Sequence, residues 1–82
     1  MSRHSARATR ALQRLSEADP ALAALSFWID HRDGETGDLP ARSGDAAITY
    51  GAAFETLSLA EQTGLAAHHI LHVAFRHAAR GA

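Results

Sequence analysis

Four of the six histidines in this 82-residue chain lie within ten residues, at His68, His69, His72 and His77. His68 and His72 are four residues apart, so on an α-helix their side chains project from one face with their Cβ atoms about 5–6 Å apart. Two imidazoles held this way on a rigid helix can both bind one zinc ion. The spacing therefore indicates a metal-binding pair, and the alternative is an ordinary pair of solvated or half-buried histidines.

The residue that follows the first histidine of the pair decides what a bound metal could do. Zinc peptidases with this spacing carry a glutamate there, and its carboxylate deprotonates or orients the metal-bound water. This chain has His69 at that position. Imidazole is shorter than the glutamate side chain, and beside a metal cation it tends to be neutral. The ligand spacing is present, and the general base is not.

The histidines require a helix, which the sequence predicts from Leu59 to Arg80. Ser58 and Glu61 form a capping box at its start, and no proline interrupts it. On a helical wheel, His69 falls on the polar side of this helix, away from a broad apolar arc. The arc predicts the core face, made of Ala67, Leu71, Ala74, Phe75 and Ala78. The aromatic residues expected in the core or at its edge are Phe27, Trp28, Phe54 and Phe75.

The elements before this helix follow from hydrophobic periodicity and from helix and turn signals. Ser2 or Ser5 is expected to cap the first helix, and Asp19 followed by Pro20 is typical of the start of a second. The predicted elements are a helix over 1–16, a short helix over 20–25, strands over 26–32, 39–43 and 46–50, and a helical turn over 52–56. The expected fold class is α+β, with two N-terminal helices, a two- or three-stranded antiparallel sheet and a long C-terminal helix.

The stretch from Ala67 to His77 reads AHHILHVAFRH, and a predicted strand, a helical turn and an acid-capped helix start precede it. This arrangement resembles the metallopeptidase domain found at the N-terminus of bacterial von Willebrand factor A-like proteins. The likeness is good over residues 46–77 and loose over residues 20–45. Ala67–His77 is its specific part.

The resemblance implies a zincin-like fold, in which an active-site helix packs against a small, mostly antiparallel sheet. It also implies that His68 and His72 are zinc ligands, with His69 in the place of the general base. Zincins take a third ligand from beyond these two. His77 lies about 140° around the helix from His72, so it cannot complete the site from the same helix. The remaining candidates, which the sheet would have to bring close, are Asp30, His31 and Asp45.

The leading hypothesis is a metallopeptidase-like domain with a degenerate motif, which binds zinc through His68 and His72. The missing carboxylate at His69 argues against peptide hydrolysis. The alternative is a non-catalytic interaction or assembly module that retains a zincin-like scaffold. We expect residues 1–82 to be one domain, the N-terminal part of a longer metallopeptidase-like domain.

Composition narrows the partners and the cellular location. Half of the 38 hydrophobic residues are alanine, so the core is small, and we expect as partner a second copy of the chain or the missing C-terminal part of the same protein. The absence of cysteine excludes disulfides and thiolate metal ligands. No apolar run approaches the roughly 20 residues of a membrane span, and no secretory signal is visible, so a cytoplasmic location without a membrane partner is expected.

Nucleic acid is not expected as a partner, because the net charge is −1. The basic residues of the first predicted helix form one stripe, which we interpret as a solvated face. Its members are Arg3, Arg7, Arg10 and Arg14.

Overall fold

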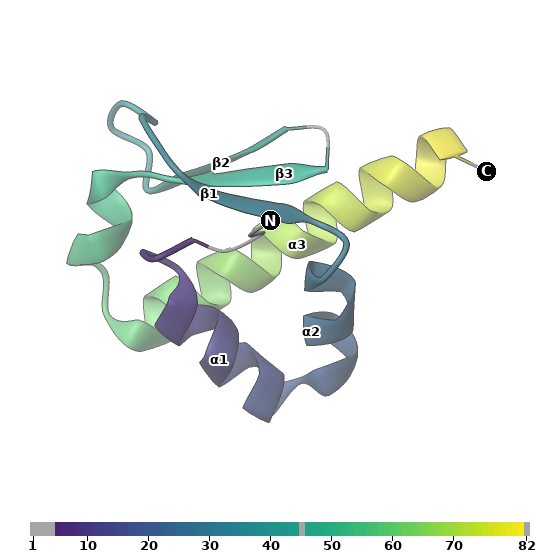
Figure 1. Ribbon diagram of the computed structural model, residues 1–82, viewed down its shortest axis with the longest axis horizontal. Helices are drawn as coiled ribbons and strands as arrows, with labels where there is room; N and C mark the ends of the chain where they lie inside the picture. The colour runs from purple at the N-terminus through teal and green to yellow at the C-terminus, as the bar shows by residue number, and fades with distance from the viewer. Residues whose placement is uncertain (1–4, 45, 82) are drawn as a thin grey trace.

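In the computed structural model the chain adopts an α+β fold in which the helices cover one face of a small sheet (Figure 1). The structure describes residues 5–44 and 46–81, with side chains as far as Arg76. The elements are α1 (Thr9–Ala18), α2 (Pro20–Ser26), β1 (Asp30–Asp33), β2 (Ala41–Gly44), β3 (Ala47–Tyr50), the 3-10 helix η1 (Ala52–Thr56) and α3 (Leu59–Gly81). The predicted fold class is confirmed. No helix in the described ranges is both long and apolar enough to span a bilayer.

The sheet is mixed, whereas the sequence predicted antiparallel strands. Its strand order is β1-β3-β2, with β3 parallel to β1 and antiparallel to β2. A parallel pair cannot be joined by a tight hairpin and needs a longer connection. The loop after β1 and the edge strand β2 together form this connection between β1 and β3. The hairpin from β2 to β3 is the part of the sheet whose direction the sequence predicted correctly.

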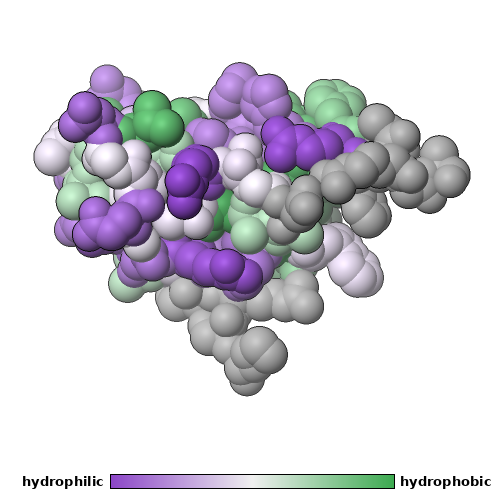
Figure 2. Space-filling model, turned by 90° about the horizontal axis from the view of Figure 1, so that it is seen from above, coloured by the Kyte–Doolittle hydropathy of each residue, from purple (hydrophilic) through white to green (hydrophobic). Residues whose placement is uncertain are grey.

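Side chains alternate between the two faces of the sheet. His31, Ile48 and Tyr50 are buried on the inner face against the helices. Arg32 and Arg42 flank Thr49 in one row on the opposite face, where both arginines are exposed. Figure 2 views the molecule from above the sheet and shows hydrophilic residues over much of this face. The sheet therefore has one side in the core and one side in solvent.

β1 begins four residues later than predicted, because helical hydrogen bonding continues past α2. Asp19 caps α2 by accepting from the Leu22 N–H, with Pro20 as the first helical residue, as predicted. Beyond the end of α2, the N–H groups of Phe27 and Trp28 still donate to carbonyls three residues earlier. Both side chains are mostly exposed, at 75% and 79%, rather than packed in the core.

The buried face of α3 differs from the one predicted. Ala66, Ile70 and Val73 are buried, at spacings of four and three residues. Leu71 and Phe75, which the wheel placed in the core, are 39% and 70% exposed. The predicted arc was centred on alanines, whose small side chains contribute little to burial, so contacts with α1 and the sheet set the orientation instead. Ala78 lies outside the described side chains.

The capping box at the start of α3 forms as predicted. The Ser58 hydroxyl accepts from the Glu61 N–H, and the Glu61 carboxylate accepts from the Ser58 N–H. These bonds satisfy two backbone groups that the first turn would otherwise leave without partners. The start of the histidine-bearing helix is therefore fixed by local sequence.

Arg7 connects the N-terminal segment to the end of the sheet and to η1. Its guanidinium donates to the backbone carbonyls of Gly34 at 3.2 Å and Tyr50 at 2.9 Å, and pairs with the Glu55 carboxylate at 2.8 Å. Its backbone N–H donates to the Asp33 carboxylate. One planar side chain thus links three segments that are far apart in sequence.

The prediction of a solvated arginine stripe is wrong for Arg7 and correct for Arg10 and Arg14, which are exposed. Arg3 and the alternative cap Ser2 lie outside the described residues. Ser5, the other predicted cap, accepts from the Ala8 N–H just before α1. It also donates to Asp33.

We expect Arg7→Lys to lower the free energy of unfolding by about 1–2 kcal/mol, because an ammonium group cannot reproduce the fork of hydrogen bonds. Urea denaturation followed by circular dichroism measures the change. The matched control is Arg10→Lys, the same substitution at an exposed position, which should stay within about 0.5 kcal/mol of wild type. Equal losses in the two variants would show that Arg7 does not link these segments.

Candidate metal centre

The His68 and His72 rings lie side by side on α3, as their spacing predicted. Their centroids are 4.5 Å apart, and the rings meet edge to face with an interplanar angle of 74°. Both side chains are exposed. The helix backbone holds the two imidazoles together in the absence of a metal, so little ordering is required before they bind one ion.

His69 lies between this pair and the core rather than on the polar side, where the wheel placed it. It is half-buried, and it is three residues from Ala66 and four from Val73, both of which are buried. Its Nδ1 atom is buried without a hydrogen-bond partner among the described residues. The His69 ring also lies edge to face with the ring of His68, at a centroid distance of 5.7 Å.

Burial of the His69 ring lowers its pKa, and the neighbouring imidazoles of His68 and His72 lower it further. Desolvation penalises the charged form of a histidine, and nearby positive charge does the same. His69 is therefore neutral at neutral pH. An imidazole beside a bound metal tends to be neutral. For His69, burial and the two neighbouring imidazoles already favour the neutral form without a metal.

The pair is bordered by apolar side chains that sequence reasoning had assigned to the core. Leu71 and Phe75 are exposed next to His68 and His72 on the side of α3 that faces away from the core. Burial of Ala66, Ile70 and Val73 on the opposite side requires this arrangement, because all these side chains radiate from one helix. The exposed back of α3, the side opposite its buried face, therefore carries both the histidine pair and apolar side chains.

No third ligand among the described residues approaches the pair. In the part of the chain that the structure describes, no group of three His, Asp or Glu residues can hold a metal ion. Asp30 forms an ion pair with Arg32 at 2.6 Å on β1. Asp45 and the His77 side chain lie outside the described part. Glu61 is held in the capping box, and its hydrogen bonds with Ser58 lower the pKa of its carboxyl.

His31, the remaining candidate ligand, is buried on the inner face of β1 and serves a different purpose. Its Nδ1 lies 3.0 Å from the Tyr50 hydroxyl, and its Nε2 lies 3.1 Å from the Ser26 carbonyl oxygen. A carbonyl only accepts, so Nε2 carries the proton and Nδ1 accepts from Tyr50. Burial raises the pKa of Tyr50, which keeps its hydroxyl protonated as that donor. His31 thus ties the sheet to the end of α2.

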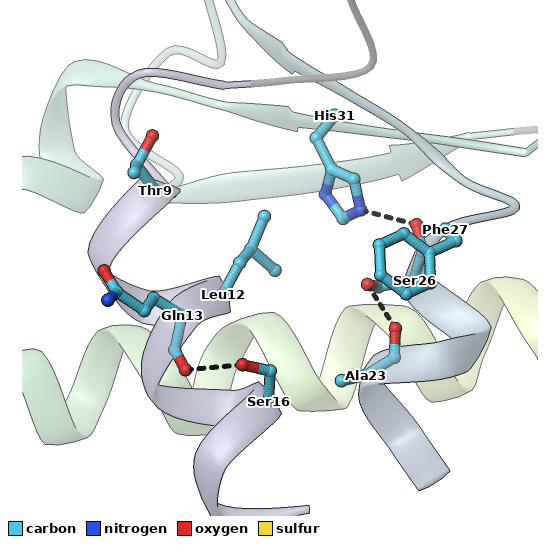
Figure 3. A pocket seen from close by; sticks show the side chains of 8 residues that line it. All are labelled: Thr9, Leu12, Gln13, Ser16, Ala23, Ser26, Phe27 and His31. Atoms are coloured by element: carbon cyan, nitrogen blue, oxygen red, sulfur yellow. Dashed lines mark hydrogen bonds between the residues drawn. The ribbon is translucent and has the colours of Figure 1, made fainter. Parts of the chain in front are cut away.

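His31 also lines a pocket of about 340 Å³ between α1 and α2, which Figure 3 shows from close by. The hydroxyls of Ser16 and Ser26 at this pocket donate to backbone carbonyls of their own helices. Its lining residues are Thr9, Leu12, Gln13, Ser16, Ala23, Ser26, Phe27 and His31. Only one of them is a good metal ligand, so this pocket is not an alternative zinc site.

The imidazoles of His68 and His72 are suitable as two of the ligands of a zinc ion. Neutral imidazole is one of the ligands that zinc prefers, and an exposed pair one turn apart can occupy two of the four positions of a tetrahedral site. Water or ligands from outside the described residues must fill the other two. Chemically, the arrangement can hold a zinc ion with open positions, and no carboxylate in the described ranges is placed to activate a bound water.

A family profile described as “Putative metallopeptidase domain” matches residues 3–82 of the chain. No curated protein and no solved structure matches the sequence. The matched span includes the helix that carries both exposed histidines, together with the sheet and the two helices before it.

The lowered pKa of His69 predicts how stability changes with pH. A histidine whose pKa is lower in the folded chain binds more protons when unfolded, so acid favours unfolding. We expect the free energy of unfolding to fall as the pH drops through about 6.5, the ordinary histidine pKa, and on towards the lowered value. His69→Gln should make that fall smaller.

Urea denaturation of both proteins across this pH range measures the effect. The difference between them at about pH 8, where His69 is neutral in the folded and unfolded chains, provides the baseline. A pH dependence that is identical in the two proteins would contradict the assignment.

Proposed function

This chain belongs to the putative metallopeptidase domain family, and on that premise we propose that α3 binds a zinc ion through His68 and His72. The membership confirms the family that the Ala67–His77 stretch predicted. The metal and its ligands are the part that remains a proposal. A metallopeptidase family implies a metal, and this helix carries the pair of donors best suited to hold one.

The observation that supports the proposal is the disposition of the two rings. They are adjacent, exposed and mounted on a capped helix that is anchored in the core through Ile70. An incoming ion would meet both imidazoles without displacing buried side chains. An ordinary pair of surface histidines has the same spacing, and the family supports the metal-binding interpretation.

When bound, zinc lowers the pKa of a coordinated water and polarises a peptide carbonyl. The chain's own contribution is the position of the two imidazoles of His68 and His72. The His69 ring is half-buried towards the core, and its Nδ1 is enclosed. No carboxylate of the described residues is placed to take a proton from that water, so we propose that this chain binds metal with little or no peptidase activity.

Metal binding can be tested by titrating zinc into the purified chain and measuring the dissociation constant by calorimetry. We expect His68→Asn and His72→Asn each to weaken zinc binding at least tenfold, since removing even an outer-shell partner of a ligand costs about 10–100-fold. His69→Asn is the matched control. It removes an adjacent imidazole on the same helix, and zinc affinity should stay within about twofold of wild type.

Unchanged affinity in the His68→Asn and His72→Asn variants would refute the site. Circular dichroism of each variant shows whether the helix is intact. The substitutions at His68 and His72 are on exposed positions, where effects on stability are generally small.

The role of position 69 can be tested by supplying the missing base. With zinc in excess, so that each chain holds its own ion with open positions for water, we expect His69→Glu to raise the cleavage of an unfolded peptide substrate by about 10²-fold over wild type, the lower end of what a positioned general base contributes. The control is His69→Gln, which has the shape of glutamate without its charge. If the Glu and Gln variants cleave the substrate equally slowly with zinc bound, the missing base is not what limits activity.

The second candidate function is a non-catalytic assembly module, and the exposed apolar side chains favour it. Three large aromatic residues, Phe27, Trp28 and Phe75, are each at least 70% exposed. Monomeric proteins seldom leave several such side chains in solvent, and exposed apolar patches often mark interaction surfaces. The two candidates are compatible, because Phe75, one of these three residues, lies beside the histidine pair on α3.

A further inference from the structure

We propose that two copies of this chain share one zinc ion, with His68 and His72 of each copy supplying its four ligands. The inference rests on the zinc binding proposed above and adds the partner that completes the site. The occupant of the exposed back of α3 is thus a second copy of the chain.

The first argument is the number of ligands. Structural zinc sites are almost always four-coordinate and closed by protein ligands. One copy offers an adjacent pair, and its described residues contain no third donor in reach. In a dimer with two-fold symmetry the same residues from both copies meet at the axis. Two imidazoles from each copy give four ligands, which complete a tetrahedral zinc site without any further residue.

The second argument is access. His68 and His72 are exposed on the side of α3 opposite its buried face, which contains Ile70 and Val73. The sheet and α1 pack against that buried face, so they do not stand between the pair and an approaching molecule. A second α3 can therefore approach the ligand pair without rearrangement of the fold.

The third argument is the apolar surface next to the pair. Leu71 and Phe75 flank the histidines, and Phe75 is 70% exposed. In a symmetric dimer these side chains would surround the metal and shield it from water. Dry surroundings strengthen the bonds between the imidazoles and the ion.

The size of this apolar surface predicts that the dimer depends on the metal. An aromatic side chain buries about 150–250 Å², so Phe75 offers at most about 250 Å² at this surface. A stable interface needs about 800 Å² on each partner. The apolar contacts alone fall well short, and the four zinc bonds must supply the rest. We therefore expect a monomer without zinc and a dimer with it.

The test measures the mass of the whole chain by sedimentation equilibrium, with a chelator and with half an equivalent of zinc. With chelator, the expected mass is that of the 8.7 kDa monomer. With zinc, we expect the mass to double and elemental analysis to give one zinc for two chains. His72→Asn should stay monomeric in zinc, whereas the control His69→Asn should dimerise as wild type does.

Phe75→Ala provides a second variant that keeps all the ligands. We expect it to bind zinc and to weaken the dimer about tenfold, as truncation of a buried aromatic anchor does. Because Phe75 is exposed in one copy, this substitution should not unfold the monomer.

The possible results separate this inference from the proposed function. A monomer with one zinc bound would overturn the shared site and leave zinc binding by α3 in place. A protein that binds no zinc would overturn both. A dimer that persists in chelator, or that forms equally in His72→Asn, would show that apolar contacts or other ligands hold the copies together and would overturn the shared site.

Discussion

The burial of one face of α3 controls what the rest of this molecule can do. Side chains radiate from a helix at fixed angles, so a helix that buries Ala66, Ile70 and Val73 must direct His68 and His72 outwards. It must also leave His69 at the boundary between core and solvent, where its ring is half-buried and its pKa is lowered. The exposed histidine pair, the neutral His69 and the exposed apolar residues beside the pair thus all follow from which face of α3 is buried.

Two polar networks hold the framework on which this helix packs. Arg7 joins the start of the chain to the ends of β1 and β3, and His31 joins β1 to Tyr50 and to the end of α2. Both use side chains whose types are common in catalytic or binding sites. Here their hydrogen bonds are made within the protein, which matters for a small domain in which four of the eleven residues of the described core cluster are alanine. His31 therefore stabilises the fold, whereas His68 and His72 are exposed and form the proposed metal-binding pair.

Among the described residues of one copy the proposed metal site has two ligands, and its open positions connect the two candidate functions. A pair of imidazoles on an exposed helix binds zinc with open positions, which suits either catalysis by a bound water or closure by another molecule. A catalytic site would need a carboxylate base, and position 69 holds an imidazole instead. Closure needs only further ligands, and the exposed Leu71 and Phe75 favour a neighbouring molecule at this surface. The imidazole in place of the base and the proposed assembly role are therefore consistent.

The sequence alone determined the features that depend on neighbours along the chain. These are the capping box at Ser58, the Asp19–Pro20 helix start, the four-residue spacing of His68 and His72, and the family. Prediction from the sequence failed where contacts between distant segments override the local pattern of residues. The strand predicted over 26–32 was shortened because α2 continued its hydrogen bonds, and the parallel pairing of β1 with β3 required a return that no local signal specifies. The rotation of α3, and with it the exposure of Phe75 and the burial of His69, was decided only by packing, because a helical wheel shows which residues share a face but not which face the other elements cover.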